Sequence, residues 1–104
     1  MTEQVVAEIS VVPLGTAGAS LSSYVAACVE AAKKASDISY QLTAMGTIVQ
    51  GPLKRVLEVA EEMHQVPFAS GAKRVLTTIK IDDRRDRPGP RMDAKLKSVE
   101  DKLE

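Results

Sequence analysis

The chain has 104 residues, of which 44% are hydrophobic and 3% aromatic, and its 14 Lys and Arg balance its 14 Asp and Glu. This length predicts one domain with a modest core that association would enlarge. Without a positive surplus to attract phosphates or anionic lipid, and with few aromatic rings to stack on bases, the composition argues against nucleic-acid or membrane partners.

Cysteine usage and hydropathy point to a reducing compartment. Cys28 is the single cysteine, so one chain can form neither an internal disulfide nor a thiolate metal cage. The sequence has no run of about 18 apolar residues that would span a membrane, and no basic region followed by a long apolar stretch at its N-terminus. We therefore expect a cytoplasmic protein.

The first third of the chain predicts a strand, a loop and a helix. Residues 5–14 are rich in β-branched side chains and end at Pro13-Leu-Gly15, the pattern of a strand that runs into a loop. After the small-residue loop 15–20, Ser20 or Ser22 could cap a helix with apolar residues at three- and four-residue spacing. Those residues are Leu21, Tyr24, Val25, Cys28, Val29 and Ala32.

The stretch 39–52 is the most informative part of the sequence. It predicts two strands folded at Met45-Gly46, because β-branched residues flank a glycine that can adopt the dihedrals of a tight reversal. Gly51-Pro52 then ends the second strand at the start of a helix, since Pro is favoured in a first helical turn. We expect that helix to stop before Pro67. Its apolar stripe is Leu53, Val56, Leu57, Ala60 and Met63.

Residues 74–82 predict the last strand. Val75, Thr77, Ile79 and Ile81 alternate strictly with Leu76, Thr78 and Lys80, which indicates one buried face. The resulting order is βαββαβ, the ferredoxin-like α+β sandwich with two helices on one face of a four-stranded antiparallel sheet.

The C-terminal segment predicts one more helix. After a charged turn, residues 91–103 carry a narrow apolar seam of the coiled-coil kind, formed by Met92, Leu96, Val99 and Leu103. A lone helix this short needs a surface to lie against, either its own sheet or a second subunit. We expect a single domain over residues 1–104, with a core at 5–82 and a C-terminal assembly arm at 83–104.

Two helices leave the other face of such a sheet uncovered. That face carries Ser10 and Val12 and, depending on strand parity, members of the set Tyr40, Thr43, Thr47, Val49 and Thr78. Apolar surface that stays exposed to water forgoes roughly 25 cal/mol of stabilisation per Å². A solvent-exposed apolar face of several hundred Å² therefore implies a partner. We expect a homodimer or homotetramer.

Three separated segments resemble a known family. They are Pro13-Leu-Gly15, the hairpin Met45-Gly-Thr-Ile-Val-Gln-Gly51, and the run from Arg74 to Pro88. In order and spacing they closely resemble the small thiamine-binding family, formerly an uncharacterised protein family. The resemblance implies a ferredoxin-like subunit that assembles through its sheets into dimers and tetramers. It also implies non-enzymatic binding of thiamine or its hydroxymethylpyrimidine moiety.

A thiamine site needs an apolar slot for the pyrimidine and a few amide or hydroxyl partners. The hypothesised ligand-binding residues are Ser10, Thr43 and Thr47 as hydroxyl partners, Met45 as an apolar wall, Gly46 for close backbone approach, and Gln50 as the amide. The family pattern usually has Glu at the position of Gln50, and a neutral amide offers a thiazolium ion no counter-charge. Each residue also has a plain structural interpretation as strand, core or turn residue.

Other functions have less support. His64 and Cys28 lack partners at ligand or catalytic spacing, so we expect no metal, no cofactor and no catalysis. An acylphosphatase-like enzyme would use the loop 15–20 as a phosphate cradle, yet that loop contains no Arg or Lys. The serious alternative is a structural or interaction module that oligomerises through its sheet face without a small-molecule ligand.

Overall fold

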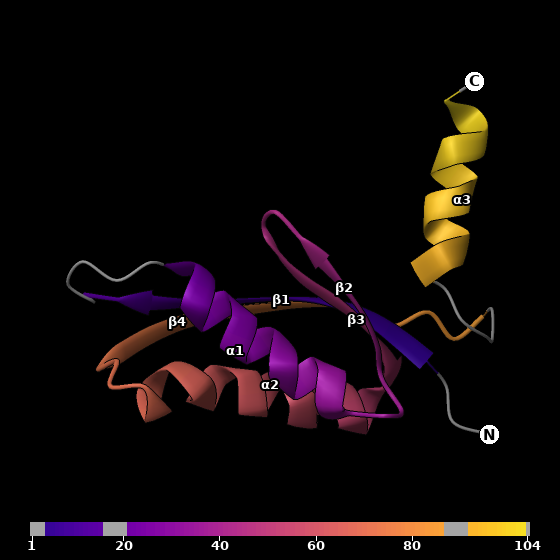
Figure 1. Ribbon diagram of the computed structural model, residues 1–104. Coiled ribbons are helices and arrows are strands. Elements are labelled where there is room, and N and C mark those ends of the chain that lie inside the picture. The colour runs from indigo at the N-terminus through magenta and orange to yellow at the C-terminus, as the bar shows by residue number, and fades with distance from the viewer. Residues whose placement is uncertain (1–3, 16–20, 87–91, 104) are drawn as a thin grey trace.

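The computed structural model describes residues 4–15, 21–86 and 92–103. Its elements are β1 (Gln4–Leu14), α1 (Leu21–Lys34), β2 (Ser39–Thr43), β3 (Gly46–Pro52), α2 (Leu53–Ala69), β4 (Arg74–Asp82) and α3 (Met92–Lys102). This order confirms the expected ferredoxin-like α+β sandwich, with α1 and α2 on one side of the sheet (Figure 1). Of the two candidate helix caps, Ser20 lies outside the described residues and Ser22 lies within α1.

The sheet is antiparallel with strand order β2-β3-β1-β4. Ile9 lies opposite Thr47 on β3 and Ile79 on β4, so these three side chains point to the same face. That face is the helix side, because Ile9 is buried. Of the set proposed for the uncovered face, Tyr40, Thr47 and Val49 belong instead to the helix side, and only Thr43 and Thr78 join Ser10 and Val12.

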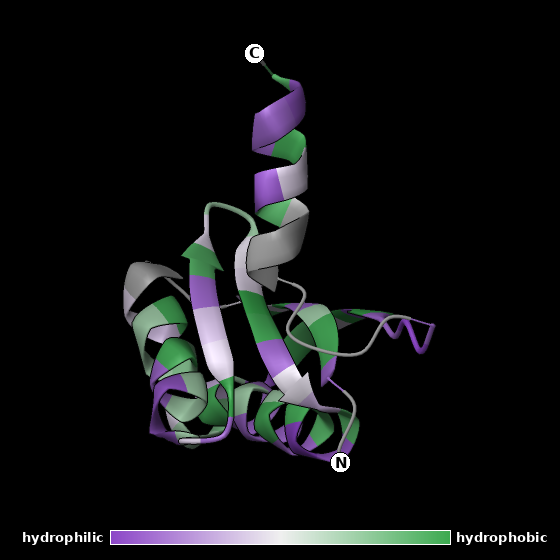
Figure 2. Ribbon diagram, turned by 90° about the vertical axis from the view of Figure 1, so that its right-hand side faces the viewer, coloured by the Kyte–Doolittle hydropathy of each residue, from purple (hydrophilic) through white to green (hydrophobic). Residues whose placement is uncertain are grey.

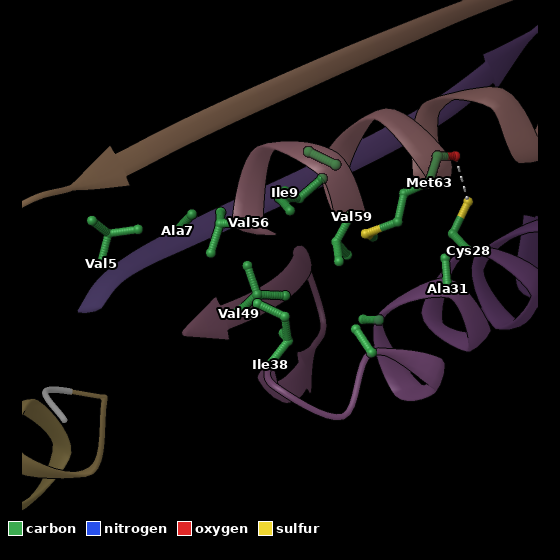
Figure 3. Close-up of a cluster of buried hydrophobic side chains, with 13 residues drawn as sticks. Val5, Ala7, Ile9, Cys28, Ala31, Ile38, Val49, Val56, Val59 and Met63 are labelled. Atoms are coloured by element: carbon green, nitrogen blue, oxygen red, sulfur yellow. Dashed lines mark hydrogen bonds between the residues drawn. The ribbon is translucent and has the colours of Figure 1, made fainter. Parts of the chain in front are cut away.

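Small and medium aliphatic side chains fill the core between sheet and helices (Figure 3). On α1 the buried residues are Cys28, Ala31 and Ala32, whereas Val25 is exposed. On α2 Val59 is buried and Leu57 is exposed, so both predicted stripes are rotated relative to the faces that pack. The small side chains on α1 allow it to lie close to α2, and close packing rather than spacing alone decides which residues are covered.

The expectation that the second helix stops before Pro67 is wrong. α2 continues to Ala69, and Pro67 is buried inside it. A proline at this position removes the N–H that would bond the carbonyl of Met63. The thiol of Cys28 donates a hydrogen bond to that same oxygen over 3.4 Å (Figure 3). A contact from α1 therefore replaces the helical bond that Pro67 removes.

The loop between α1 and β2 is held against α2 and β3. Arg55 Nε donates to Asp37 Oδ2 over 2.8 Å, and this hydrogen bond holds the pKa of the Asp37 carboxyl below its usual range. The loop passes directly over Gly51, where a Cβ atom would lie 3.2 Å from the Asp37 carbonyl oxygen and would overlap the side chain of Ile38. Glycine at position 51 is what allows the loop to approach the strand.

The predicted C-terminal helix is present as α3, and it stands clear of the sandwich (Figure 2). Leu96, Val99 and Leu103 of its seam are exposed, while the side chain of Met92 lies outside the described part. In the described ranges, no helix is both long enough and apolar enough to cross a membrane.

Candidate functional site

A pocket forms where β1 extends beyond its neighbour. Pairing between β1 and β3 ends at Ile9 and Thr47, whereas β1 continues to Leu14 beside β4 alone. The edge of β1 beyond Ile9 therefore faces no strand on the β3 side. A pocket of about 170 Å³ opens there, between residues 9–12 of β1, residues 42–47 of the hairpin and parts of both helices.

The structure brings five of the six predicted site residues to this pocket. Ser10, Thr43, Met45, Gly46 and Thr47 all line it. Gln50 does not, because it lies opposite Val6 and Ser39 on the face of the sheet away from the helices, where it is 8% exposed. Since side chains alternate along a strand, Thr47 and Gln50 cannot reach the same side of β3.

Two of the predicted hydroxyl partners have different roles. Thr43 Oγ1 donates to the carbonyl oxygen of Gly46 over 2.9 Å and accepts from the backbone N–H of Met45 over 3.3 Å, so it fixes the hairpin turn. Thr47 is 3% exposed, and its hydroxyl forms no hydrogen bond within the described residues. Within the described residues, every side-chain oxygen that is fully shielded from solvent has a hydrogen-bond partner. Thr47 therefore lines the pocket as an almost fully buried residue whose hydroxyl could pair with a ligand there.

Gly46 allows the hairpin to approach β1. A Cβ atom at this position would lie 3.0 Å from the carbonyl oxygen of Ile9, closer than side-chain carbons normally come to a backbone oxygen. The close backbone approach expected for Gly46 is therefore a property of the fold, and it sets the width of the pocket at its hairpin end.

Three pocket residues come from the helices, namely Val25, Cys28 and Met63. Cys28 contributes a protonated thiol, since burial raises its pKa and the thiol donates to Met63. Sequence reasoning placed none of the three at the site, because spacing shows that a helix has an apolar face but not which strand that face meets. Leu42, which also lines the pocket, lies opposite Thr47 across the hairpin, and that pairing is a signal from which it could have been found.

Charged side chains are absent from the described lining of the pocket. The arginine-rich turn after β4 is paired locally, with Arg84 Nε 2.7 Å from Asp86 Oδ1 and Arg85 Nη2 2.9 Å from Asp83 Oδ2. Within residues 4–15, 21–86 and 92–103, no group of three or more His, Cys, Asp or Glu could hold a metal ion. The pocket thus combines apolar walls with hydroxyl groups and carries no charge.

His64 has a structural position within the last third of α2. Its Nδ1 lies 2.7 Å from Thr77 Oγ1 on β4, and its ring meets the edge of Phe68 with centroids 5.5 Å apart. The contact with Thr77 ties α2 to the edge strand, and His64 does not line the pocket.

Fold and pocket together define a small ferredoxin-like protein with an uncharged, single-ring-sized cavity beside a hairpin tip. The sequence profile of the thiamine-binding protein family matches residues 7–100. The chain belongs to this family.

Relatives match almost end to end. A UPF0045 protein of Methanothermobacter thermautotrophicus is 44% identical over 95% of this chain and 99% of its own length. The UPF0045 protein YqgV of Bacillus subtilis is 37% identical over 95% and 97%. Among solved structures, the hypothetical protein MJ1052 of Methanocaldococcus jannaschii superposes with a TM-score of 0.83 at 37% identity, covering 95% of this chain and 98% of that one.

Proposed function

We propose that this protein binds thiamine or its hydroxymethylpyrimidine moiety in the pocket at the hairpin tip, without catalysis, as a cytoplasmic homo-oligomer. The observation that carries the proposal is the uncharged pocket of about 170 Å³ that Thr47 lines. The family to which the chain belongs supports the identity of the ligand.

The size of the pocket favours one ring. A protein cavity of about 150 Å³ accommodates a benzene molecule, so the space beside Thr47 suits a pyrimidine and leaves the thiazolium outside. The absence of charge in the described lining also suits the neutral ring, because a buried cation without a counter-charge is costly. In this arrangement Thr47 on the helix side offers the hydroxyl partner, Met45 covers the ring as an adaptable wall, and Ser10 lines the pocket with its side chain on the other face of β1.

Ligand binding is tested by thermal shift and calorimetry with hydroxymethylpyrimidine, thiamine and the thiamine phosphates. A ligand at 100 times its dissociation constant stabilises the protein by about 2.7 kcal/mol. We expect stabilisation by the free pyrimidine at least as large as that by thiamine, and recovery of each ligand unchanged. If none of these compounds shifts the unfolding transition, the chain is an interaction module without a metabolite.

Thr47→Val should weaken binding of hydroxymethylpyrimidine about tenfold or more, because the isosteric side chain leaves a polar ring group without its partner. The measurement is isothermal titration calorimetry. Thr78→Val is the matched control, since Thr78 is a strand threonine on the opposite face of the sheet and does not line the pocket. Equal losses in the two variants would remove Thr47 from the site.

The oligomer in this proposal uses the uncovered sheet face and α3. Deletion of residues 91–104 should lower the assembly mass measured by light scattering, because the seam of Leu96, Val99 and Leu103 is exposed in the single chain and needs a partner. Lys97→Ala on the same helix is the control and should leave the mass unchanged. A truncated protein that keeps the parent assembly would contradict this role of the arm.

A further inference from the structure

Val11 lies on the part of β1 that extends past the hairpin. Pairing of β1 with β3 stops at Ile9 and Thr47, and two residues further the same register would place Met45 opposite Val11. Met45 lies instead in the hairpin turn, where its backbone N–H donates to Thr43 Oγ1 over 3.3 Å. In the described part of the chain, Val11 therefore has no strand residue opposite it on the β3 side.

The direction of the Val11 backbone groups follows from that of Ile9. A Cβ atom on Gly46 would lie 3.0 Å from the carbonyl oxygen of Ile9, so this carbonyl points toward the hairpin. Backbone groups alternate between the two sides of a strand, and Val11, two residues on, presents its N–H and its C=O to the hairpin side as well. The residues before and after it present theirs to β4, with which they pair. The two Val11 groups thus face the pocket, which this residue lines.

Pro13 isolates this pair of backbone groups. It lies two residues beyond Val11, so its nitrogen is on the same side of β1, and a proline has no N–H to offer. Proline is tolerated in a sheet where no partner strand needs its N–H, and it opposes the addition of another strand along such an edge. Between Ile9 and the end of β1, Val11 is the residue with an N–H on this side.

The Val11 pair is held in a fixed position. Its side chain packs against the hydrophobic core, and on the other side of the strand it pairs with Thr77 of β4. Thr77 is in turn held by His64 of α2, whose Nδ1 lies 2.7 Å from its hydroxyl. Thr77 and Val75 are half-buried, whereas the remaining side chains on that face of β4 are 42% and 38% exposed. The single buried face predicted for β4 is therefore confined to the half of the strand that supports Val11.

We propose that the backbone N–H and C=O of Val11 bind the edge of a neutral heterocycle in which a ring nitrogen lies next to an amino group. The ring nitrogen accepts from the N–H and the amino group donates to the C=O. Hydroxymethylpyrimidine has such an edge, so the inference rests on the proposed function and adds to it the residue that selects the ligand. The ring then occupies the place beside β1 that a further residue of β3 would otherwise fill.

Backbone groups give the pocket a selectivity that its hydroxyl groups lack. A hydroxyl can donate or accept, so Thr47 could pair with many polar substituents. An N–H beside a C=O fixes both the position and the sense of the two hydrogen bonds. A ring without the nitrogen or without the amino group would leave one Val11 group shielded from water and unpaired, which is costly.

Two analogues of hydroxymethylpyrimidine test the two hydrogen bonds separately by isothermal titration calorimetry. In the first, a methyl group replaces the amino group, so the donor to the Val11 carbonyl is lost. In the second, an aniline, C–H groups replace both ring nitrogens, so the acceptor for the Val11 N–H is lost and the molecule stays neutral. We expect each analogue to bind about tenfold or more weakly than hydroxymethylpyrimidine. Equal affinity of either analogue would overturn the hydrogen bond that it lacks.

Val11→Pro connects the ring nitrogen to this residue, because it removes the N–H, and Pro13 shows that β1 accepts proline on this side. The variant should weaken binding of hydroxymethylpyrimidine about tenfold or more and leave the affinity for the aniline analogue nearly unchanged. Val11→Ala is the matched control, since it shortens the side chain, keeps the N–H and should change both affinities by the same factor. Equal losses for the two ligands in Val11→Pro would remove the N–H from the site.

Hydrogen exchange of the Val11 N–H, followed by NMR, tests the same group in the unsubstituted chain, so the result does not depend on how the proline variant folds. In the free protein this N–H should exchange faster than those of Ser10 and Val12, which face β4. Saturation with hydroxymethylpyrimidine should slow it about tenfold or more. A Val11 N–H that is as slow as its neighbours in the free protein would overturn the inference without any ligand.

The same measurements separate this inference from the proposed function. If neither hydroxymethylpyrimidine nor thiamine stabilises the protein, the proposed function fails and the assignment of Val11 fails with it. If hydroxymethylpyrimidine binds but leaves the exchange rate of the Val11 N–H unchanged, the proposed function stands and only the assignment of Val11 is wrong.

Discussion

Gly51→Ala is expected to lower the free energy of unfolding by about 1 to 3 kcal/mol, the typical cost of forcing an extra carbon into a packed site. The new Cβ atom would overlap the Ile38 side chain and lie 3.2 Å from the carbonyl oxygen of Asp37. Relief requires the α1–β2 loop to move away from β3, and the Arg55–Asp37 ion pair resists that movement. Urea denaturation at one protein concentration measures the change.

Two variants separate the steric cause from other costs of replacing a glycine. Ile38→Val shortens the side chain that the new carbon meets, so Gly51→Ala should cost less in that background. Gly15→Ala is the second control, because Gly15 has a φ of +73° with open space around its Cβ position, and its cost of about 1 kcal/mol is purely conformational. If Gly51→Ala unfolds at the same urea concentration as the parent, the packing of the loop on β3 is wrong.

The features that could be predicted from the sequence are those that depend on neighbours along the chain. The hairpin, the helix start after Pro52 and the alternation from Arg74 to Asp82 each reflect local backbone preference. The turn itself was placed one residue too late, because it lies at Ala44-Met45 and Gly46 begins β3 without a positive φ. These elements leave few topologies, so the sandwich follows. Five site residues were found together because the hairpin and β1 meet in any sheet of this order.

The features that were missed depend on contacts between distant parts of the chain. Gln50 was included because of the family motif. Side chains alternate along β3, so Thr47 and Gln50 point to opposite faces, and only the pairing of β3 with β1 shows which of the two faces the helices. The end of α2 was misplaced because Pro67 was considered alone. A residue on α1, Cys28, compensates for it, and no local pattern around Pro67 contains that information.

That compensation makes a second quantitative prediction. Cys28→Ala should lower the free energy of unfolding by about 2 kcal/mol, because it leaves the buried Met63 carbonyl without a donor, and an unpaired buried acceptor costs about 1 to 3 kcal/mol. Cys28→Ser should cost less, since its hydroxyl keeps a donor at that position. Pro67→Ala, by contrast, supplies a backbone N–H that can bond the same oxygen.

The decisive measurement is the double-mutant cycle of Cys28→Ala and Pro67→Ala by urea denaturation. If the thiol and a residue-67 N–H serve the same acceptor, Cys28→Ala should cost about 1 kcal/mol less when residue 67 is alanine, because the carbonyl then regains its helical partner. The volume lost on removing the sulfur is the same in both backgrounds and cancels in the cycle. If Cys28→Ala costs the same with proline and with alanine at position 67, the Met63 carbonyl does not couple the two residues. The continuation of α2 through Pro67 would then depend on apolar packing of the buried proline alone.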